Sequence, residues 1–241
     1  MEASDWKRVL YFTLASRALD DIEETRLVPE QKVLYQFSAR GHEMAQVILG
    51  SLLDRPHDAV GAYYRSRPML LTLGLSLEDA FAAPMGKSGG FSNGRDIGVV
   101  CNLPKADGPI VLPMSGDVGS QYTPAVGWAQ GVTYHRDVLG DRGYDGSIAV
   151  VLGGEASVAT NGFWSALTIA TTLSLPVLFY IEDNGYGISV PSSFQTPGGD
   201  IAANLASFRN LLVRNGDAAV PDLEAERVSA SREGEESAVE H

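Results

Sequence analysis

Residues 147–154, SIAVVLGG, decide the fold expected for this chain. Their aliphatic run ends in a pair of glycines, a pattern typical of a buried strand in a parallel sheet. A helix is expected over residues 161–173, because four apolar residues share one helical stripe: Phe163, Ala166, Leu167 and Ala170. LPVLFYIEDNGYG, from residue 175, then predicts a second buried strand. Strand, helix and strand in this order predict a right-handed βαβ unit.

Outward from this unit, the pattern predicts an α/β fold with a parallel sheet flanked by helices. Further helices are expected over residues 5–25, 42–53, 76–83 and 121–138. In the first of them, one face carries apolar side chains that we expect to be buried: Trp6, Val9, Leu10, Leu14 and Ala18. GVVCNLP, residues 98–104, is interpreted as a buried strand, and the rest of 54–108 as mainly loops.

Composition limits the domain organisation and the partners. We expect one domain over residues 1–220, with an N-terminal helical segment, and a disordered acidic tail over 221–241. The net charge of −12 argues against nucleic acid or an anionic membrane as a partner. A single cysteine, Cys101, excludes an intramolecular disulfide and fits a reducing compartment. No stretch has the apolar length that crosses a bilayer, so a cytoplasmic protein is expected.

Polar residues follow both predicted strands. Glu155 comes after the first and Asn184 after the second, and parallel strands end at the same edge of a sheet. A carboxylate, an amide oxygen and a nearby carbonyl suit Mg²⁺ or Ca²⁺. Small residues at 153, 154, 156 and 157 allow backbone N–H groups to approach an anion. Glycines and Asp-Asn-Gly are also common turn residues, but their pairing at matched strand ends favours a site for a metal-bound diphosphate.

The spacing between the residues that follow the first predicted strand and those that follow the second resembles the spacing in a thiamine diphosphate signature. The signature reads Gly-Asp-Gly and later Asn-Asn, and this chain has Gly-Glu-Ala at 154–156 and Asp-Asn at 183–184. AYYRSR (62–67), SGDVGSQYTPAVGWA (115–129) and NGYGISVP (184–191) occur in the order found in one family. It is the α subunit of the first, decarboxylating component of 2-oxoacid dehydrogenase complexes, of the branched-chain or pyruvate type. The similarity extends from about residue 6 to residue 217.

The resemblance implies thiamine diphosphate and Mg²⁺ as cofactors, bound in a thiamine diphosphate-binding fold. The implied Mg²⁺ ligands are the side chains of Glu155 and Asn184 and the carbonyl of Tyr186. The implied diphosphate contacts are Tyr64, Arg65, Gly154, Ala156 and Ser157. The aminopyrimidine would lie against Gly116 and Val118.

The implied function is oxidative decarboxylation of a 2-oxo acid, with transfer of the acyl group to the lipoyl arm of a dihydrolipoyl acyltransferase. A β subunit, expected in a heterotetramer, would supply the carboxylate that activates the aminopyrimidine. No catalytic residue is therefore assigned in this chain.

The sequence also departs from the family. Glu155 is one methylene longer than the usual Asp, and Ala156 replaces a Gly, where a methyl fits unless φ is positive. Glu182 stands where relatives often carry a neutral or basic residue. The family's later loop, rich in Arg and His, has no counterpart before the acidic tail, so the chain is expected to be shortened.

A non-catalytic relative that binds cofactor weakly stays open as an alternative. A nicotinamide-binding Rossmann domain is weakly supported, because GGEASVA lacks G-x-G-x-x-G.

Overall fold

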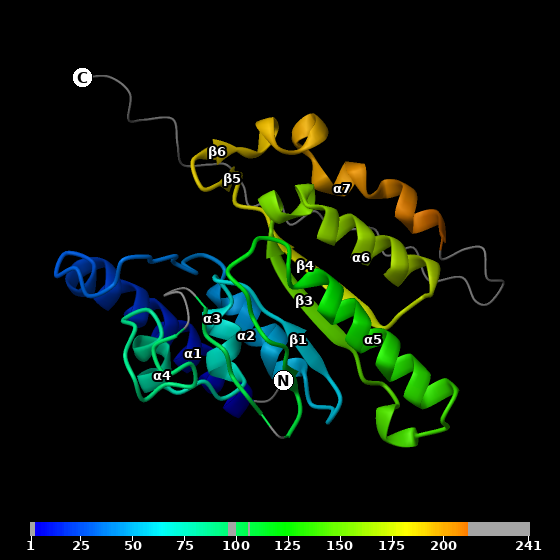
Figure 1. Ribbon diagram of the computed structural model, residues 1–241, viewed down its shortest axis with the longest axis horizontal. Coiled ribbons are helices and arrows are strands. Elements are labelled where there is room, and N and C mark those ends of the chain that lie inside the picture. Colours follow the sequence, from blue (N-terminus) through cyan, green and yellow to red (C-terminus); the bar gives the residue numbers. More distant parts are fainter. Residues whose placement is uncertain (1–2, 96–99, 106, 212–241) are drawn as a thin grey trace.

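The computed structural model describes residues 3–95, 100–105 and 107–211. Its main sheet has parallel strands in the order β2-β1-β3-β4. Their bounds are β1 Ala59–Gly61, β2 Ile110–Val111, β3 Ala149–Gly154 and β4 Val177–Glu182. Helices cover both faces of the sheet (Figure 1). The predicted α/β class, a parallel sheet flanked by helices, is confirmed.

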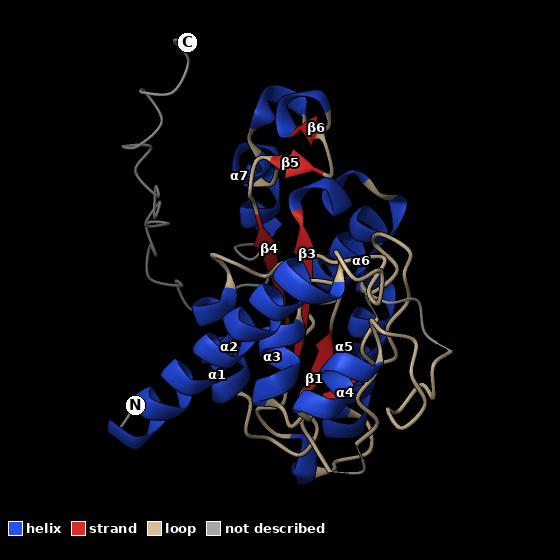
Figure 2. Cartoon of the chain, turned by 90° about the vertical axis from the view of Figure 1, so that its left-hand side faces the viewer, coloured by secondary structure: helices blue, strands red, loops and turns tan. Residues whose placement is uncertain are grey.

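The helices form a layer on each side of the sheet. Figure 2 shows α1, α2 and α3 on one side of the strands and α5 and α6 on the other. The helices are α1 Ala3–Ile22, α2 Glu43–Leu52, α3 Arg67–Thr72, α4 Leu77–Ala82, α5 Tyr122–Asp137, α6 Asn161–Thr172 and α7 Ile201–Asn204. A π-helical turn, Glu23–Leu27, continues α1, and a small antiparallel hairpin pairs β5 Tyr186–Gly187 with β6 Val190–Pro191.

Each layer buries its own apolar cluster against the sheet. On the α1–α3 side, Met69 and Leu70 of α3 pack with Leu152 of β3. On the α5–α6 side, Tyr122 and Phe163 pack with Val151, the neighbour of Leu152 in β3. Successive residues of β3 thus face opposite clusters, so β3 is completely buried, as its uninterrupted apolar sequence predicts.

The strand order places a topological switch between β1 and β3. From β1 the chain proceeds outward to β2, whereas from β3 it proceeds in the opposite direction to β4. The loops that leave β1 and β3 therefore diverge at the carboxyl edge of the sheet. Ligands of open parallel sheets bind at such an edge, and the hairpin β5–β6 lies beyond the same ends of β3 and β4 (Figure 2).

The predicted βαβ unit is present. All residues of the predicted α6 stripe are buried, and the Thr160 side chain caps the helix by accepting a hydrogen bond from Phe163 N. The second strand differs from the prediction, because β4 is only partly buried and Leu178 is 42% exposed. The reason is its position as the outermost strand of the described sheet, where one side of the strand lacks a neighbour.

The buried face predicted for the first helix is wrong. Trp6, Leu10 and Leu14 are exposed, and of the predicted stripe only Val9 is buried. The inward face carries Val9 and Leu19 together with Asp20 of α1 and Glu23, whose carboxylates form ion pairs with Arg67 on α3. Buried carboxylates need this partner, so the ion pairs help to set a rotation of the helix that differs from the predicted stripe.

The segment between α2 and α5 contains more regular structure than expected. Helices over 42–53, 76–83 and 121–138 are confirmed as α2, α4 and α5, but β1 and α3 were not predicted. Cys101 is buried, yet the described part of the predicted strand 98–104 has no strand structure. The predicted acidic tail, 221–241, lies outside the described residues. No described helix has the length and apolarity needed to span a membrane.

Candidate functional site

A pocket of about 260 Å³ opens at the carboxyl edge of the sheet. Its walls come from the loops after β1, β2 and β3 and from the hairpin β5–β6. The structure brings together nearly all of the residues predicted for the site: Tyr64, Arg65, Gly116, Val118, Gly154, Glu155, Ala156, Ser157 and Tyr186 line this pocket. Asn184 is outside the lining, although its backbone contacts Glu155.

Glu155 is a buried carboxylate with an unused oxygen. Its side chain belongs to a residue that is 1% exposed. Oε2 accepts a hydrogen bond from the backbone N of Asn184 at 3.5 Å, whereas Oε1 has no partner among the described residues. Such a group is costly to bury unless a ligand supplies the missing interaction. A hard divalent cation would do so, and carboxylate oxygen is one of its preferred ligands.

Asn184 contacts the same carboxylate through its backbone N–H. Its Oδ1 accepts a hydrogen bond from Tyr186 N at 3.0 Å, which folds residues 184–186 into a tight turn. An amide oxygen has a second lone pair that this turn leaves unused. The candidate metal ligands at the site are therefore of mixed type, a carboxylate oxygen and an amide oxygen. The described residues contain no cluster of three or more His, Cys, Asp and Glu side chains that could hold a metal.

Arg65 is a half-buried cation with no carboxylate partner among the described residues. Its Cζ lies 5.5 Å from the Tyr64 ring centroid and 5.9 Å from the Tyr63 ring centroid. Nε is buried without a hydrogen-bond partner in the described structure. A guanidinium held by two aromatic rings is ready to bind an anion through its remaining N–H groups.

The two adjacent glycines at the end of β3, Gly153 and Gly154, have different roles. A Cβ on Gly153 would lie 1.9 Å from the Tyr122 hydroxyl, so packing requires glycine there. A Cβ on Gly154 would meet nothing closer than 3.9 Å, and φ is −84°. Gly154 is therefore not required by packing or by backbone conformation. Its small size instead leaves room in the pocket, where its nearest side-chain neighbour would be Arg65.

Ala156 and Ser157 belong to the 3₁₀ turn Glu155–Ala159. Ala156 is not among the residues with positive φ, so the backbone accepts its methyl group in place of a glycine. The Ser157 hydroxyl donates to the Gly154 carbonyl at 2.5 Å and lies 2.5 Å from the Tyr122 hydroxyl. Burial raises the pKa of Tyr122 to about 12, so this hydroxyl keeps its proton. The hydroxyl of Ser157 is thus engaged inside the protein, although the residue lines the pocket.

The hairpin β5–β6 forms an apolar rim at the pocket. Ile188 is 91% exposed and has φ of 58°, which is strained for a β-branched residue. Tyr186, Val190 and Phe194 are also exposed on this hairpin or just after it, and Val118 is exposed across the pocket. These five residues are called the rim below. Strain and exposed apolar area together mark the rim as a binding region.

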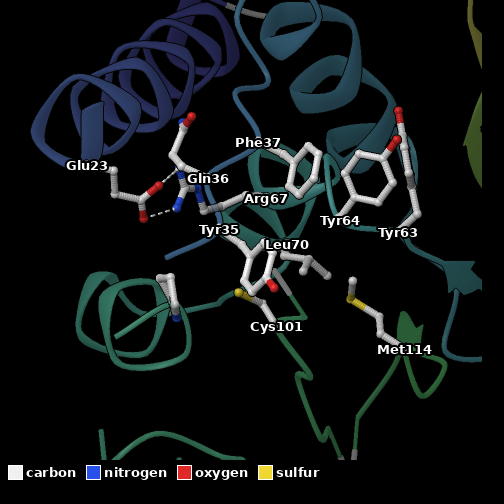
Figure 3. Close-up of a pocket in the computed structure, with 11 residues that line it drawn as sticks. Glu23, Tyr35, Gln36, Phe37, Tyr63, Tyr64, Arg67, Leu70, Cys101 and Met114 are labelled. Carbon is white, nitrogen blue, oxygen red and sulfur yellow. Dashed lines mark hydrogen bonds and ion pairs between the residues drawn. The ribbon is translucent and has the colours of Figure 1, made fainter. Parts of the chain in front are cut away.

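An aromatic wall separates the pocket from a second, smaller cavity. Figure 3 shows the rings of Phe37, Tyr64 and Tyr63 in a row, with the Tyr64 and Phe37 centroids 4.7 Å apart. The cavity behind the wall has a volume of about 20 Å³, enough for one water molecule. The ion pair between Arg67 and Glu23 closes its far side. The contacts between these rings, and those of the Arg65 guanidinium with the Tyr63 and Tyr64 rings, position Tyr64 and Arg65 at the pocket.

Sequence reasoning missed several residues of the site. Tyr63 was inside a quoted motif but had no role assigned, and Gln46 lies on α2, far from any motif. Both donate to the buried carboxylate of Glu182, Gln46 through Nε2 at 2.7 Å and Tyr63 through its hydroxyl. No local pattern could reveal this pairing, because Gln46 and Glu182 are 136 residues apart.

The chain is similar to known proteins along most of its length. A family model described as the dehydrogenase E1 component matches residues 13–231. The chain is 31% identical over 166 residues to the 2-oxoisovalerate dehydrogenase subunit alpha of Bacillus subtilis (strain 168), covering 66% of this chain and 46% of the relative. It is 24% identical over 197 residues to the mitochondrial 2-oxoisovalerate dehydrogenase subunit alpha of Caenorhabditis elegans, covering 82% and 42%.

A third relative broadens the range of named substrates. The chain is 25% identical over 209 residues to the pyruvate dehydrogenase E1 component subunit alpha of a Staphylococcus epidermidis strain, covering 86% of this chain and 48% of the relative. The chain thus spans less than half the length of each of these relatives. The resemblance noted in the sequence is confirmed, and the chain belongs to the dehydrogenase E1 component family.

Proposed function

We propose that this chain is the α subunit of a 2-oxoacid dehydrogenase and binds the diphosphate of thiamine diphosphate together with Mg²⁺. The observation that carries the proposal is the unpartnered Oε1 of buried Glu155, in the same pocket as the unpartnered Nε of Arg65. Among the described residues, no cation pairs with Glu155 and no carboxylate lies within ion-pair distance of Arg65, although buried Glu182 attracts it from further away. A magnesium diphosphate supplies both a cation and an anion.

In this proposal each residue has a binding or orienting role. Glu155 and Asn184 hold Mg²⁺ through side-chain oxygens, and Tyr186 through its carbonyl. Arg65, Tyr64 and the backbone of Gly154, Ala156 and Ser157 bind the diphosphate, while Gly116 and Val118 hold the aminopyrimidine. When bound, thiamine diphosphate supplies the carbanion chemistry that removes CO₂ from a 2-oxo acid. The protein fixes its position and excludes water.

The second half of the site would come from a β subunit. The rim, formed by Val118, Tyr186, Ile188, Val190 and Phe194, offers this partner an exposed apolar surface next to the pocket. Burial of the rim would close the pocket to water and offset the strain at Ile188. We further propose that the assembled heterotetramer passes the acyl group to a lipoyl-bearing dihydrolipoyl acyltransferase, with a branched-chain 2-oxo acid or pyruvate as substrate.

The structure weakens one argument for the alternative, a non-catalytic relative. The Ala156 methyl requires no positive φ, so this substitution is compatible with the backbone. The longer Glu155 side chain still places an unpartnered oxygen among the pocket-lining residues. The other reason, the absence of a counterpart to the family's later loop rich in Arg and His, is not tested by the described residues.

The test is an activity assay on the chain co-expressed with a matching β subunit. Decarboxylation of pyruvate and of a branched-chain 2-oxo acid is followed with an artificial electron acceptor. We expect turnover that requires both thiamine diphosphate and Mg²⁺, and loss of turnover in Glu155→Ala and Asn184→Ala. Asp183→Asn is the matched control, because Asp183 is exposed and its side chain accepts a hydrogen bond from Gly185 N within the same turn. A well-folded complex that neither binds thiamine diphosphate nor decarboxylates either acid would overturn the proposal.

A further inference from the structure

Glu182 is a buried carboxylate directly behind the pocket wall. It ends β4 and is paired in the sheet with Gly154, which lines the pocket. It is 3% exposed. Its side chain is directed to the α1–α3 face, where Gln46 of α2 and Tyr63 bind it. The negative charge therefore has a fixed position beside the proposed diphosphate site and is shielded from solvent.

The hydrogen-bond partners of Glu182 solvate its charge without neutralising it, and the Arg65 guanidinium attracts it without forming a direct ion pair. Gln46 Nε2 donates to Oε1 at 2.7 Å, and the Tyr63 hydroxyl donates to Oε2. Both donors are uncharged, and no ion pair to Glu182 is found among the described residues. Glu23 differs in this respect, because Arg67 pairs with its carboxylate. The charge of Glu182 thus extends its field into the neighbouring pocket.

The same network holds Arg65. Gln46 Nε2 also donates to the carbonyl of Arg65 at 3.0 Å, and the Arg65 guanidinium stacks over the Tyr63 ring. Among the residues that line the pocket, Arg65 is the only Lys or Arg, while Asp117 and Glu155 are acidic. With Glu182 behind the wall, acidic groups outnumber the single cation at the place where an anion would bind.

We propose that Glu182 opposes the diphosphate and makes its binding depend on the divalent cation. The inference rests on the proposed function, and it assigns Glu182 a specificity-determining role that is separate from metal ligation. A free diphosphate would meet unfavourable electrostatics from Glu155, Asp117 and Glu182. The magnesium complex carries less negative charge, and its Mg²⁺ is coordinated by Glu155. Only this form therefore binds despite the electrostatic repulsion.

The test measures thiamine diphosphate binding by calorimetry, with Mg²⁺ and with a chelator, on the full chain co-expressed with a β subunit. The ratio of the two dissociation constants is the metal dependence. In Glu182→Gln the side chain keeps its shape and its contacts to Gln46 and Tyr63, but the charge is lost. We expect the wild-type metal dependence to be about a hundredfold or more and Glu182→Gln to lower it about tenfold, chiefly by tightening metal-free binding.

Two variants separate charge from packing. Glu43→Gln is the matched control, since Glu43 is also buried on α2 but is paired with Arg17 and absent from the pocket lining. It should retain the wild-type metal dependence. If Glu182→Gln does not fold, Glu182→Leu combined with Tyr63→Phe removes the pair together, and it should lower the dependence as well.

The outcomes distinguish this inference from the proposed function. Wild type that binds with Mg²⁺, together with an unchanged metal dependence in Glu182→Gln, overturns the inference alone. Wild type that fails to bind while Glu182→Gln binds overturns the cofactor assignment for the natural chain and supports the opposition by Glu182. Failure of both to bind overturns both.

Discussion

Substitution of the two glycines at the end of β3 should distinguish the residue needed for stability, Gly153, from the residue needed for ligand binding, Gly154. In Gly153→Ala the new Cβ would lie 1.9 Å from the hydroxyl of Tyr122 and 2.7 Å from Ser157 Oγ. Tyr122 is fully buried, so it cannot move without disturbing the core between β3 and α6. Overpacking of this kind costs about 1–3 kcal/mol. The loss of the buried hydrogen bond between Tyr122 and Ser157 adds about 1 kcal/mol.

The expected loss for Gly153→Ala is therefore about 2–4 kcal/mol of unfolding free energy. For a protein of this size that lowers the melting temperature by about 4–16 °C. Gly154→Ala should lower it by less than about 2 °C, because its Cβ would make only ordinary contacts. Its methyl group would instead occupy space in the pocket near Arg65, and we expect about tenfold weaker binding of thiamine diphosphate.

The assay is a pair of measurements on each variant: thermal unfolding followed by circular dichroism, and cofactor affinity by calorimetry. Tyr122→Phe removes the atom nearest to the new methyl group, so the double variant Gly153→Ala/Tyr122→Phe should recover part of the loss in Gly153→Ala. A coupling energy of about 1 kcal/mol between the two sites is expected. An unchanged melting temperature in Gly153→Ala, or the absence of any recovery in the double variant, would refute the steric reasoning.

Other predictions test single groups of the site. Glu155→Gln should weaken apparent Mg²⁺ affinity at least about tenfold. The metal-free variant should be no less stable than wild type, because a buried charge with an unpartnered oxygen has been removed. A lower melting temperature of the metal-free variant would contradict this. Arg65→Lys should reduce diphosphate affinity about tenfold, because a guanidinium that can bind two oxygens is replaced by a single ammonium charge. Arg142→Ala, at an exposed position, is the control and should bind thiamine diphosphate as wild type does. Equal affinities in all three proteins would show that Arg65 does not bind the diphosphate. The raised pKa of Tyr122, about 12, means that its contribution to stability is complete below pH about 10 and is lost as the pH rises towards 12. Urea unfolding at pH about 9 and about 11 should show a loss about 1 kcal/mol larger in wild type than in Tyr122→Phe, and equal losses would argue against this pKa.

The βαβ unit was predictable because its signals are local. β3 has an uninterrupted apolar run, and the buried stripe of α6 repeats at helical spacing. By contrast, β1 has only the residues Ala59–Gly61, and α3 is buried on all sides, so neither shows a periodic pattern. The rotation of α1 depended on Arg67, a residue that only the folded chain brings to Asp20 and Glu23. Partly buried β4 had the sequence of a buried strand, which shows that composition does not reveal a strand's place in the sheet.

The candidate site also divides into features with local sequence signals and features that only the folded chain creates. The segments that the resemblance identified do converge on one pocket, because parallel strands deliver their following loops to one edge. What the motifs could not reveal is the layer behind them. The same residue, Glu182, can be interpreted from sequence as a charge facing the phosphates, but in the structure its carboxylate is held from behind by Gln46 and Tyr63. In our proposal its effect on a ligand is therefore electrostatic and not steric. A substitution that looks unfavourable within a motif is thus accommodated by Gln46, which lies outside every motif, and by Tyr63, a motif residue to which the sequence assigned no role; the property that we propose it changes is the charge that the bound ligand must carry.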